Sequence, residues 1–151
     1  MPSSVTTIKI SELETTTAYG FVINGVDASD ESGFSISNAG DVNGDGLDDL
    51  IVGASSADAN SLSSGSSYVV FGTTDTSAIE LEDIEAGTGN GFVINGAAAD
   101  DYSGTSVSGA GDVNGDDLDD LIVGAKYTDP NGNTYAGSSY VVFGTTDTSA
   151  I

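Results

Sequence analysis

The sequence predicts an all-β protein that consists of two four-stranded antiparallel blades of the β-propeller type. Three observations support this prediction. Long stretches recur along the chain, the apolar residues fall in short runs of strand length, and no segment has the length of an independent amphipathic helix. The best-preserved stretch is AGDVNGDGLDDLIVGA at residues 39–54, which returns as AGDVNGDDLDDLIVGA at residues 110–125.

Other parts of the chain repeat in the same order. GFVING at 20–25 returns at 91–96, and GSSYVVFGTTDTSAI at 65–79 returns at 137–151. The second copy has gained one residue within KYTDPNGNTYA (126–136), a change that belongs in a surface loop. Such close similarity indicates a recent duplication or an engineered chain.

The repeats define the strands of each blade in order. Gly33–Asn38 alternates apolar and small polar residues, and Leu50–Ala54 is a continuous apolar run, typical of a strand that is buried on both faces. Ser67–Gly72 is β-branched and aromatic, and Gly91–Asn95 is the fourth strand. The segments ISELE and IELEDIEAG are too short to form helices alone. The corresponding strands of the other copy are Gly104–Gly109, Leu121–Ala125, Ser139–Gly144 and, upstream, Gly20–Asn24.

This order divides the chain into an N-terminal segment (1–32), blade 1 (33–96) and blade 2 (97–151), which lacks an outer strand of its own. We expect the spare strand in segment 1–32 to complete a blade of a neighbouring subunit across the seam between them. Two blades alone would expose apolar faces and an unpaired edge. A closed homo-oligomer is therefore expected, with three copies giving six blades or four copies giving eight. A two-sheet sandwich is the alternative fold.

The charge of the chain limits the classes of partner that it is expected to bind. Against 24 acidic residues stand two bases, Lys9 and Lys126, which gives a formal net charge of −22. Nucleic acids and anionic membranes would be repelled, whereas divalent cations would be attracted. The absence of Cys and His excludes disulfides, thiolate metal sites and the commonest general base. No apolar run is long enough to span a membrane, and the start MPSSVTTIKI lacks a signal-peptide pattern.

The Asp-rich loops are candidate calcium sites, two per chain. Side-chain oxygens at positions 1, 3, 5 and 9, with a backbone carbonyl at position 7, would surround a hard cation. An EF-hand or a dockerin would need helices, but a strand follows each loop, so both are excluded. A solvated turn without metal is the alternative. The candidate ligands are Asp41, Asn43, Asp45, Leu47 and Asp49 in the first loop, and Asp112, Asn114, Asp116, Leu118 and Asp120 in the second.

The combination FSISNAGDVNGDGLDDLIVGA…SSYVVFG resembles the FG-GAP repeat of integrin α-subunit β-propellers and related bacterial surface proteins. The resemblance implies that each calcium loop joins the first two strands of a blade, and that the sites lie on one rim, away from the usual partner-binding face. One departure is Asp117, which stands where the first loop has Gly46 and predicts a weaker or strained second site. The neighbouring Asp48 and Asp119 are interpreted either as outer-sphere groups of the ion or as charges at strand edges, and we favour the strand-edge charges.

The function expected from these features is a non-enzymatic calcium-binding propeller module in which calcium is structural. The resemblance places the parent protein outside the cell or at its surface. The alternative is an adhesion or recognition module that binds protein or glycan through the variable loops 55–64 and 126–136. The tyrosines are interpreted as packing and surface residues, and the absence of Trp disfavours a lectin. An enzyme is disfavoured because the carboxylates cluster in the metal loops.

Overall fold

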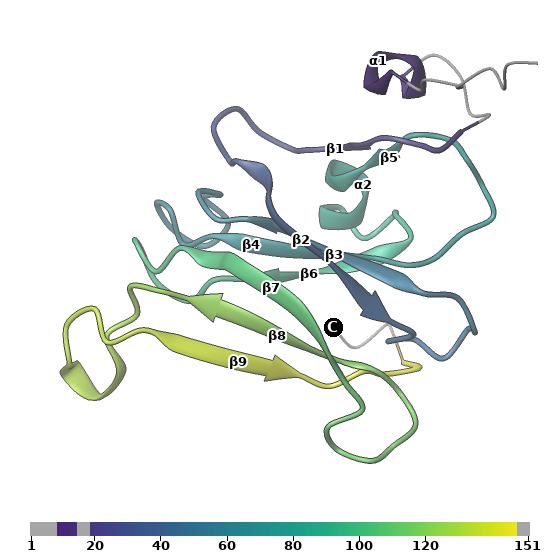
Figure 1. The fold of residues 1–151 in the computed structure, drawn as a ribbon. Coiled ribbons are helices and arrows are strands. Elements are labelled where there is room, and N and C mark those ends of the chain that lie inside the picture. The colour runs from purple at the N-terminus through teal and green to yellow at the C-terminus, as the bar shows by residue number, and fades with distance from the viewer. Residues whose placement is uncertain (1–8, 15–18, 148–151) are drawn as a thin grey trace, which may run out of the picture.

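The computed structural model describes residues 9–14 and 19–147. Two antiparallel sheets lie against each other (Figure 1). Blade 1 is the four-stranded sheet in the order β2-β3-β4-β6, and blade 2 is the sheet β7-β8-β9. The strands are β2 (Ser32–Gly40), β3 (Asp49–Ala54), β4 (Ser66–Val70), β6 (Gly91–Asn95), β7 (Ser103–Gly111), β8 (Asp120–Ala125) and β9 (Ser138–Val142).

The two blades share one register, as the repeat predicts. In blade 1, Ile51 lies opposite Ser37 and Val69. In blade 2, the corresponding Ile122 lies opposite Ser108 and Val141. The β2–β3 pairing and the β7–β8 pairing each have two register shifts, one near each end of the first strand. The sheets are all-β and antiparallel, and their strand order fits propeller blades.

The predicted strand at Gly20–Asn24 is shorter in the structure. Only Ile23–Asn24 (β1) is a strand, and it pairs in parallel with Ile79–Glu80 (β5) beside blade 1. Within the chain, this segment therefore does not complete blade 2, and its donation to another copy stays a prediction. Residues 1–8 and 15–18 of the predicted segment 1–32, and residues 148–151 of the predicted segment 97–151, lie outside the described residues.

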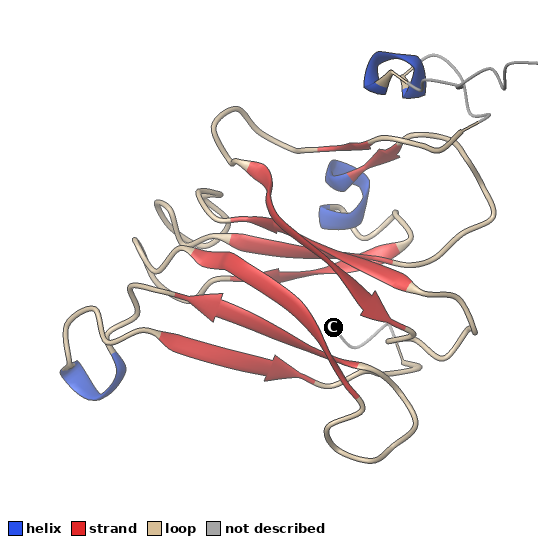
Figure 2. Cartoon of the chain, in the orientation of Figure 1, coloured by secondary structure: helices blue, strands red, loops and turns tan. Residues whose placement is uncertain are grey.

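The expectation that the short acidic segments form no helix was wrong. Helices occur at Ile10–Leu13 (α1) and Leu81–Glu85 (α2), and a 3₁₀ turn, η1, at Pro130–Gly132 (Figure 2). Leu81 and Ile84 lie on one face of α2 and are buried against blade 1. A five-residue helix is too short to be stable alone, so this contact stabilises it. None of the helices in the described ranges is long and apolar enough to cross a membrane.

The hydrophobic core between the blades is formed by one face of each sheet. Successive side chains of a strand point to opposite faces of its sheet. Every second side chain of blade 1 points toward blade 2, and every second side chain of blade 2 points toward blade 1. The backbones approach closely at Gly53, where a Cβ would lie 2.2 Å from the Gly104 carbonyl oxygen. The core consists of Ala39, Val42, Ile51, Val69, Phe71 and Phe92 from blade 1, and Leu121 and Val123 from blade 2.

Candidate metal-binding loops

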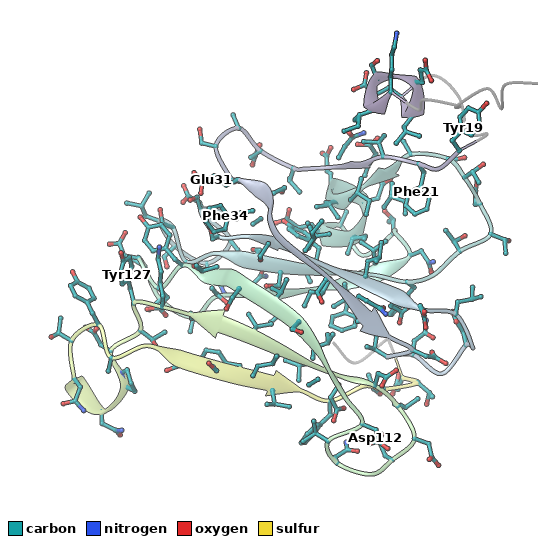
Figure 3. The ribbon with its side chains drawn as sticks, viewed as in Figure 1. Tyr19, Phe21, Glu31, Phe34, Asp112 and Tyr127 are labelled. Carbon is teal, nitrogen blue, oxygen red and sulfur yellow. The ribbon has the colours of Figure 1, made fainter. Side chains whose placement is uncertain are left out.

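The two Asp-rich loops occupy the same place in each blade and lie at the same end of the molecule. The first connects β2 to β3 and the second connects β7 to β8. The Asp119 N–H donates a hydrogen bond to the Asp41 carbonyl oxygen (3.1 Å), so the loops are in contact. Figure 3 shows the second loop, with Asp112, at the end of blade 2 that is remote from Tyr127. This placement agrees with sites on one rim.

Side-chain oxygens of the first loop point into the loop itself. Asp41 Oδ1 accepts hydrogen bonds from the N–H groups of Gly44 (2.7 Å) and Asp45 (3.1 Å), and Asp41 Oδ2 accepts one from Gly46 (2.9 Å). Asn43 Oδ1 accepts a bond from the Asp45 N–H (2.8 Å). Gly44 and Gly46 have φ angles of 79° and 87°, the left-handed conformation that curls the chain around these oxygens.

Asp49, at position 9, is a buried carboxylate that connects the loop to the sheet. Its Oδ2 accepts a hydrogen bond from the Val42 N–H (3.0 Å), and its Oδ1 accepts one from the Gly72 N–H (2.7 Å). Burial raises the pKa of Asp49, the two N–H donors oppose this rise, and the charges of Asp45 and Asp41 add to it. A cation in the loop would offset this burial cost and this repulsion.

The second loop repeats the geometry of the first. Asp112 Oδ1 accepts hydrogen bonds from Gly115 (2.6 Å) and Asp116 (3.1 Å), and its Oδ2 accepts one from the Asp117 N–H (3.0 Å). The pKa of Asp112 is lowered mainly by the Asp117 N–H. Asp120 accepts bonds from Val113 (2.8 Å) and Gly144 (2.9 Å). The backbone of each loop is therefore already arranged around negative charge.

The donor chemistry of both loops fits a hard cation, because all the polar groups at positions 1, 3, 5 and 9 offer oxygen. The Leu47 side chain is exposed, which suits a position that contributes through its backbone. Across residues 9–14 and 19–147, however, no three acidic side chains converge as they would around a metal ion. The carboxylates instead accept bonds from the loop amides. The candidate ligands are thus brought into one loop, and a cation would have to draw them closer together.

The structure gives Asp119 a role that the sequence analysis did not predict. Asp119 Oδ2 accepts a hydrogen bond from the Asp41 N–H (2.9 Å), so this side chain joins blade 2 to the first residue of the first loop. The Thr145 N–H donates to the Val42 carbonyl oxygen (2.8 Å) beside it. The interpretation of Asp119 as a strand-edge charge was wrong. Its counterpart Asp48 is exposed, as that interpretation requires.

The opposite end of blade 2 carries an aromatic cluster, which we define as Tyr102, Tyr127 and Tyr135. The rings of Tyr102 and Tyr127 lie 5.5 Å apart and those of Tyr127 and Tyr135 lie 5.3 Å apart. Lys126 Nζ lies 4.7 Å from the centre of the Tyr127 ring. A hollow of about 520 Å³ beside them is also lined by Asp100. Tyr127 and Tyr135 belong to the loop 126–136, which differs most between the blades, and Tyr102 lies in the connection before β7.

Comparison with known proteins identifies the family. The FG-GAP repeat model matches residues 32–70 and 103–142, which together make up just over half of the chain. Integrin alpha pat-2 of Caenorhabditis briggsae is 37% identical over 99 residues. That alignment covers 62% of this chain and 7% of the relative, so the chain corresponds to a small part of the longer protein. The two matches begin and end at the strands of the two blades, and the chain belongs to the FG-GAP repeat family.

Proposed function

We propose that the chain is a non-enzymatic, calcium-binding propeller module of an extracellular or cell-surface adhesion protein, in which calcium has a structural role. The adhesion context and the location are supported by the similarity to an integrin alpha protein. The resemblance to the FG-GAP family supports the binding of a divalent cation. No catalytic role is assigned, because the carboxylates that cluster in the chain are those of the two loops.

The observation that carries this proposal is the arrangement of each loop around its acidic oxygens. The same set of side-chain to backbone hydrogen bonds is present in both loops, and each ends on a fully buried Asp, at position 49 or 120. Calcium would be held by Asp41, Asn43, Asp45, Asp49 and the Leu47 carbonyl, and by their counterparts in the second loop. The ion would supply positive charge that offsets the repulsion within each loop and would stiffen the connection between two strands.

A thermal unfolding experiment tests this role. Extracellular calcium modules have Kd values on the order of 10⁻⁴–10⁻³ M, so millimolar calcium should stabilise the chain by roughly 1 kcal/mol per site. We expect a higher Tm in calcium than in EDTA, and a calorimetric stoichiometry of two ions per chain. Asp45→Asn should remove one of the two sites, whereas Asp100→Asn, which removes the same charge outside the loops, should retain both. A Tm that EDTA does not change would contradict the structural role.

A second candidate function is recognition of a protein or glycan by the loops at the opposite end. The aromatic cluster favours it, because tyrosines beside a hollow offer broad apolar faces together with hydrogen-bonding groups. Binding to a glycan or protein array should be lost in Tyr135→Ala and retained in Tyr19→Ala, since Tyr19 is exposed and lies outside the cluster. Binding that persists in Tyr135→Ala would exclude this surface.

A further inference from the structure

The two blades differ most in what covers their corresponding faces. We define the forward face of a blade as the side that blade 1 turns toward blade 2. Val69, on the forward face of blade 1, is fully buried, whereas its counterpart Val141 on blade 2 is 48% exposed. The same contrast holds for the other apolar residues of the two forward faces. Ala39, Val42, Ile51 and Phe71 are buried by blade 2, and their counterparts Ala110, Val113, Ile122 and Phe143 are exposed.

The rear faces show the reverse contrast. Val107 and Leu121, on the rear face of blade 2, pack against blade 1. Their counterparts on blade 1, Ile36 and Leu50, are exposed, Ile36 to 72%. The outer part of this rear face is already covered by α2. The chain therefore exposes an apolar area at each end, and these areas correspond to the two sides of the interface that it contains once.

The polar contacts between the blades have unused counterparts as well. Asp119 accepts the Asp41 N–H across the blade interface. The counterparts of Asp119 and Asp41 in the other blade are Asp48 and Asp112, and both are exposed. The equivalent contact would therefore join Asp48 of one copy to the Asp112 N–H of another copy. Similarly, Ser35 Oγ donates to the Gly104 carbonyl oxygen (2.7 Å), and Ser106, the counterpart of Ser35, is exposed.

A hollow of about 240 Å³ lies between the end of β6 and blade 2, and residues of β8 and β9 line it. The outer edge of β9 has no partner strand within the described residues. In blade 1, the corresponding outer edge of β4 is paired with β6, whose Gly91–Asn95 lies opposite Ser66–Val70. The sequence of Gly91–Asn95, GFVIN, is also the sequence of Gly20–Asn24. In the chain itself, this segment pairs with β5 over only two residues, so a five-residue pairing with β9 would be a longer ladder.

We propose that the occupant of these surfaces is a second copy of this chain, bound head to tail. Blade 1 of the second copy places its rear face on the forward face of blade 2, and its Asp48 accepts the Asp112 N–H. Its Gly20–Asn24 pairs with the outer edge of β9. The second copy therefore completes both the outer edge of blade 2 and the surroundings of the second Asp-rich loop. Three or four copies would close such an arrangement into a ring.

Two blocking substitutions test this arrangement. Val141→Glu places a charge on the forward face of blade 2, and Ile36→Glu places one on the rear face of blade 1. Both side chains are exposed in the single chain, so each variant should fold. By light scattering at micromolar concentration, we expect a trimer or tetramer for the unchanged chain and a monomer for each variant. An equimolar mixture of the variants should give a dimer, because the pair still has one unblocked interface.

The outcomes separate self-association from other occupants. An unchanged chain that is monomeric, variants that assemble like it, or a mixture that yields no dimer would each overturn the proposal. The first of these outcomes would assign the surfaces to a different partner. Measurement in EDTA as well as in calcium keeps a failure of calcium binding distinct, because assembly in EDTA supports the interface whether or not calcium binds.

A matched pair of smaller substitutions tests the polar contact. In the monomeric Val141→Glu background, Asp119→Ala should lower the unfolding midpoint, because it removes a contact within the chain. Asp48→Ala should leave that midpoint unchanged. In the assembling chain, Asp48→Ala should raise the dissociation constant between copies about tenfold. A dissociation constant equal to that of the unchanged chain would contradict the predicted contact of Asp48 with a second copy.

Discussion

The two Asp-rich loops are nearly identical in sequence and in their internal hydrogen bonds, yet their surroundings differ. The first loop has blade 2 behind it, where Asp119 and Thr145 hold its backbone. Val42 in that loop is 1% exposed, whereas Val113 in the second loop is 59% exposed. The shape of the loop is therefore determined locally by Asp, Asn and Gly residues, and its burial is determined by the adjacent blade. Within this chain, an adjacent blade is what buries the apolar residue of the loop.

The largest expected effect comes from a comparison of two glycines that have similar φ angles but different neighbours. Gly65 has a φ of 81°, and a Cβ there would lie 2.1 Å from the Ser103 carbonyl oxygen. Gly137 has a φ of 75°, and its nearest neighbour would be the Lys126 carbonyl oxygen at 3.2 Å. We expect Gly65→Ala to lower the free energy of unfolding by about 4 kcal/mol, because backbone of the two blades must separate. Gly137→Ala should cost about 1–2 kcal/mol from its left-handed conformation.

Chemical denaturation in the monomeric Val141→Glu background measures both values. Equal losses would show that the blade interface is not constrained at Gly65. In the assembling chain, Gly137 occupies the position that Gly65 has at the interface, so Gly137→Ala should also prevent assembly. If Gly137→Ala assembles normally, the interface between copies differs from the interface between blades.

The structural features that depend on local sequence patterns could be predicted from the sequence. The period-two alternation and the repeat located every strand of the two blades, with ends that differ by one or two residues. The left-handed position at residue 117 was also predictable, since Asp117 replaces a glycine there and has a φ of 70°. Both features are encoded within a few neighbouring residues.

Features that depend on distant contacts were missed. Asp119 and Asp48 have the same local sequence, and only the position of a blade behind the first loop gives Asp119 its partner. The helix α2 has too few residues to be stable by propensity, and it forms because Leu81 and Ile84 reach the apolar side of blade 1. The pairing of β1 with β5 likewise joins segments that are far apart in the sequence.

The smallest expected effect concerns position 6 of the loops. Asp117 and Gly46 both adopt positive φ angles, 70° and 87°, and their N–H groups donate to the same oxygen of the position-1 Asp. Space is not the constraint, because a Cβ at Gly46 would have nothing within 4 Å. Asp117→Gly should therefore stabilise the calcium-free chain by less than about 1 kcal/mol, through relief of the left-handed strain and of one repelling charge.

Gly46→Asp is the reciprocal change and should destabilise the calcium-free chain by a similar amount. Calorimetry should find the second loop weaker than the first in the unchanged chain, and Asp117→Gly should bring the two affinities together. If the charge of Asp117 attracted calcium more strongly than its conformation strains the loop, Asp117→Gly would weaken binding instead. Because both loops have the same internal hydrogen bonds, this pair of substitutions separates the conformation at position 6 from the contribution of the neighbouring blade.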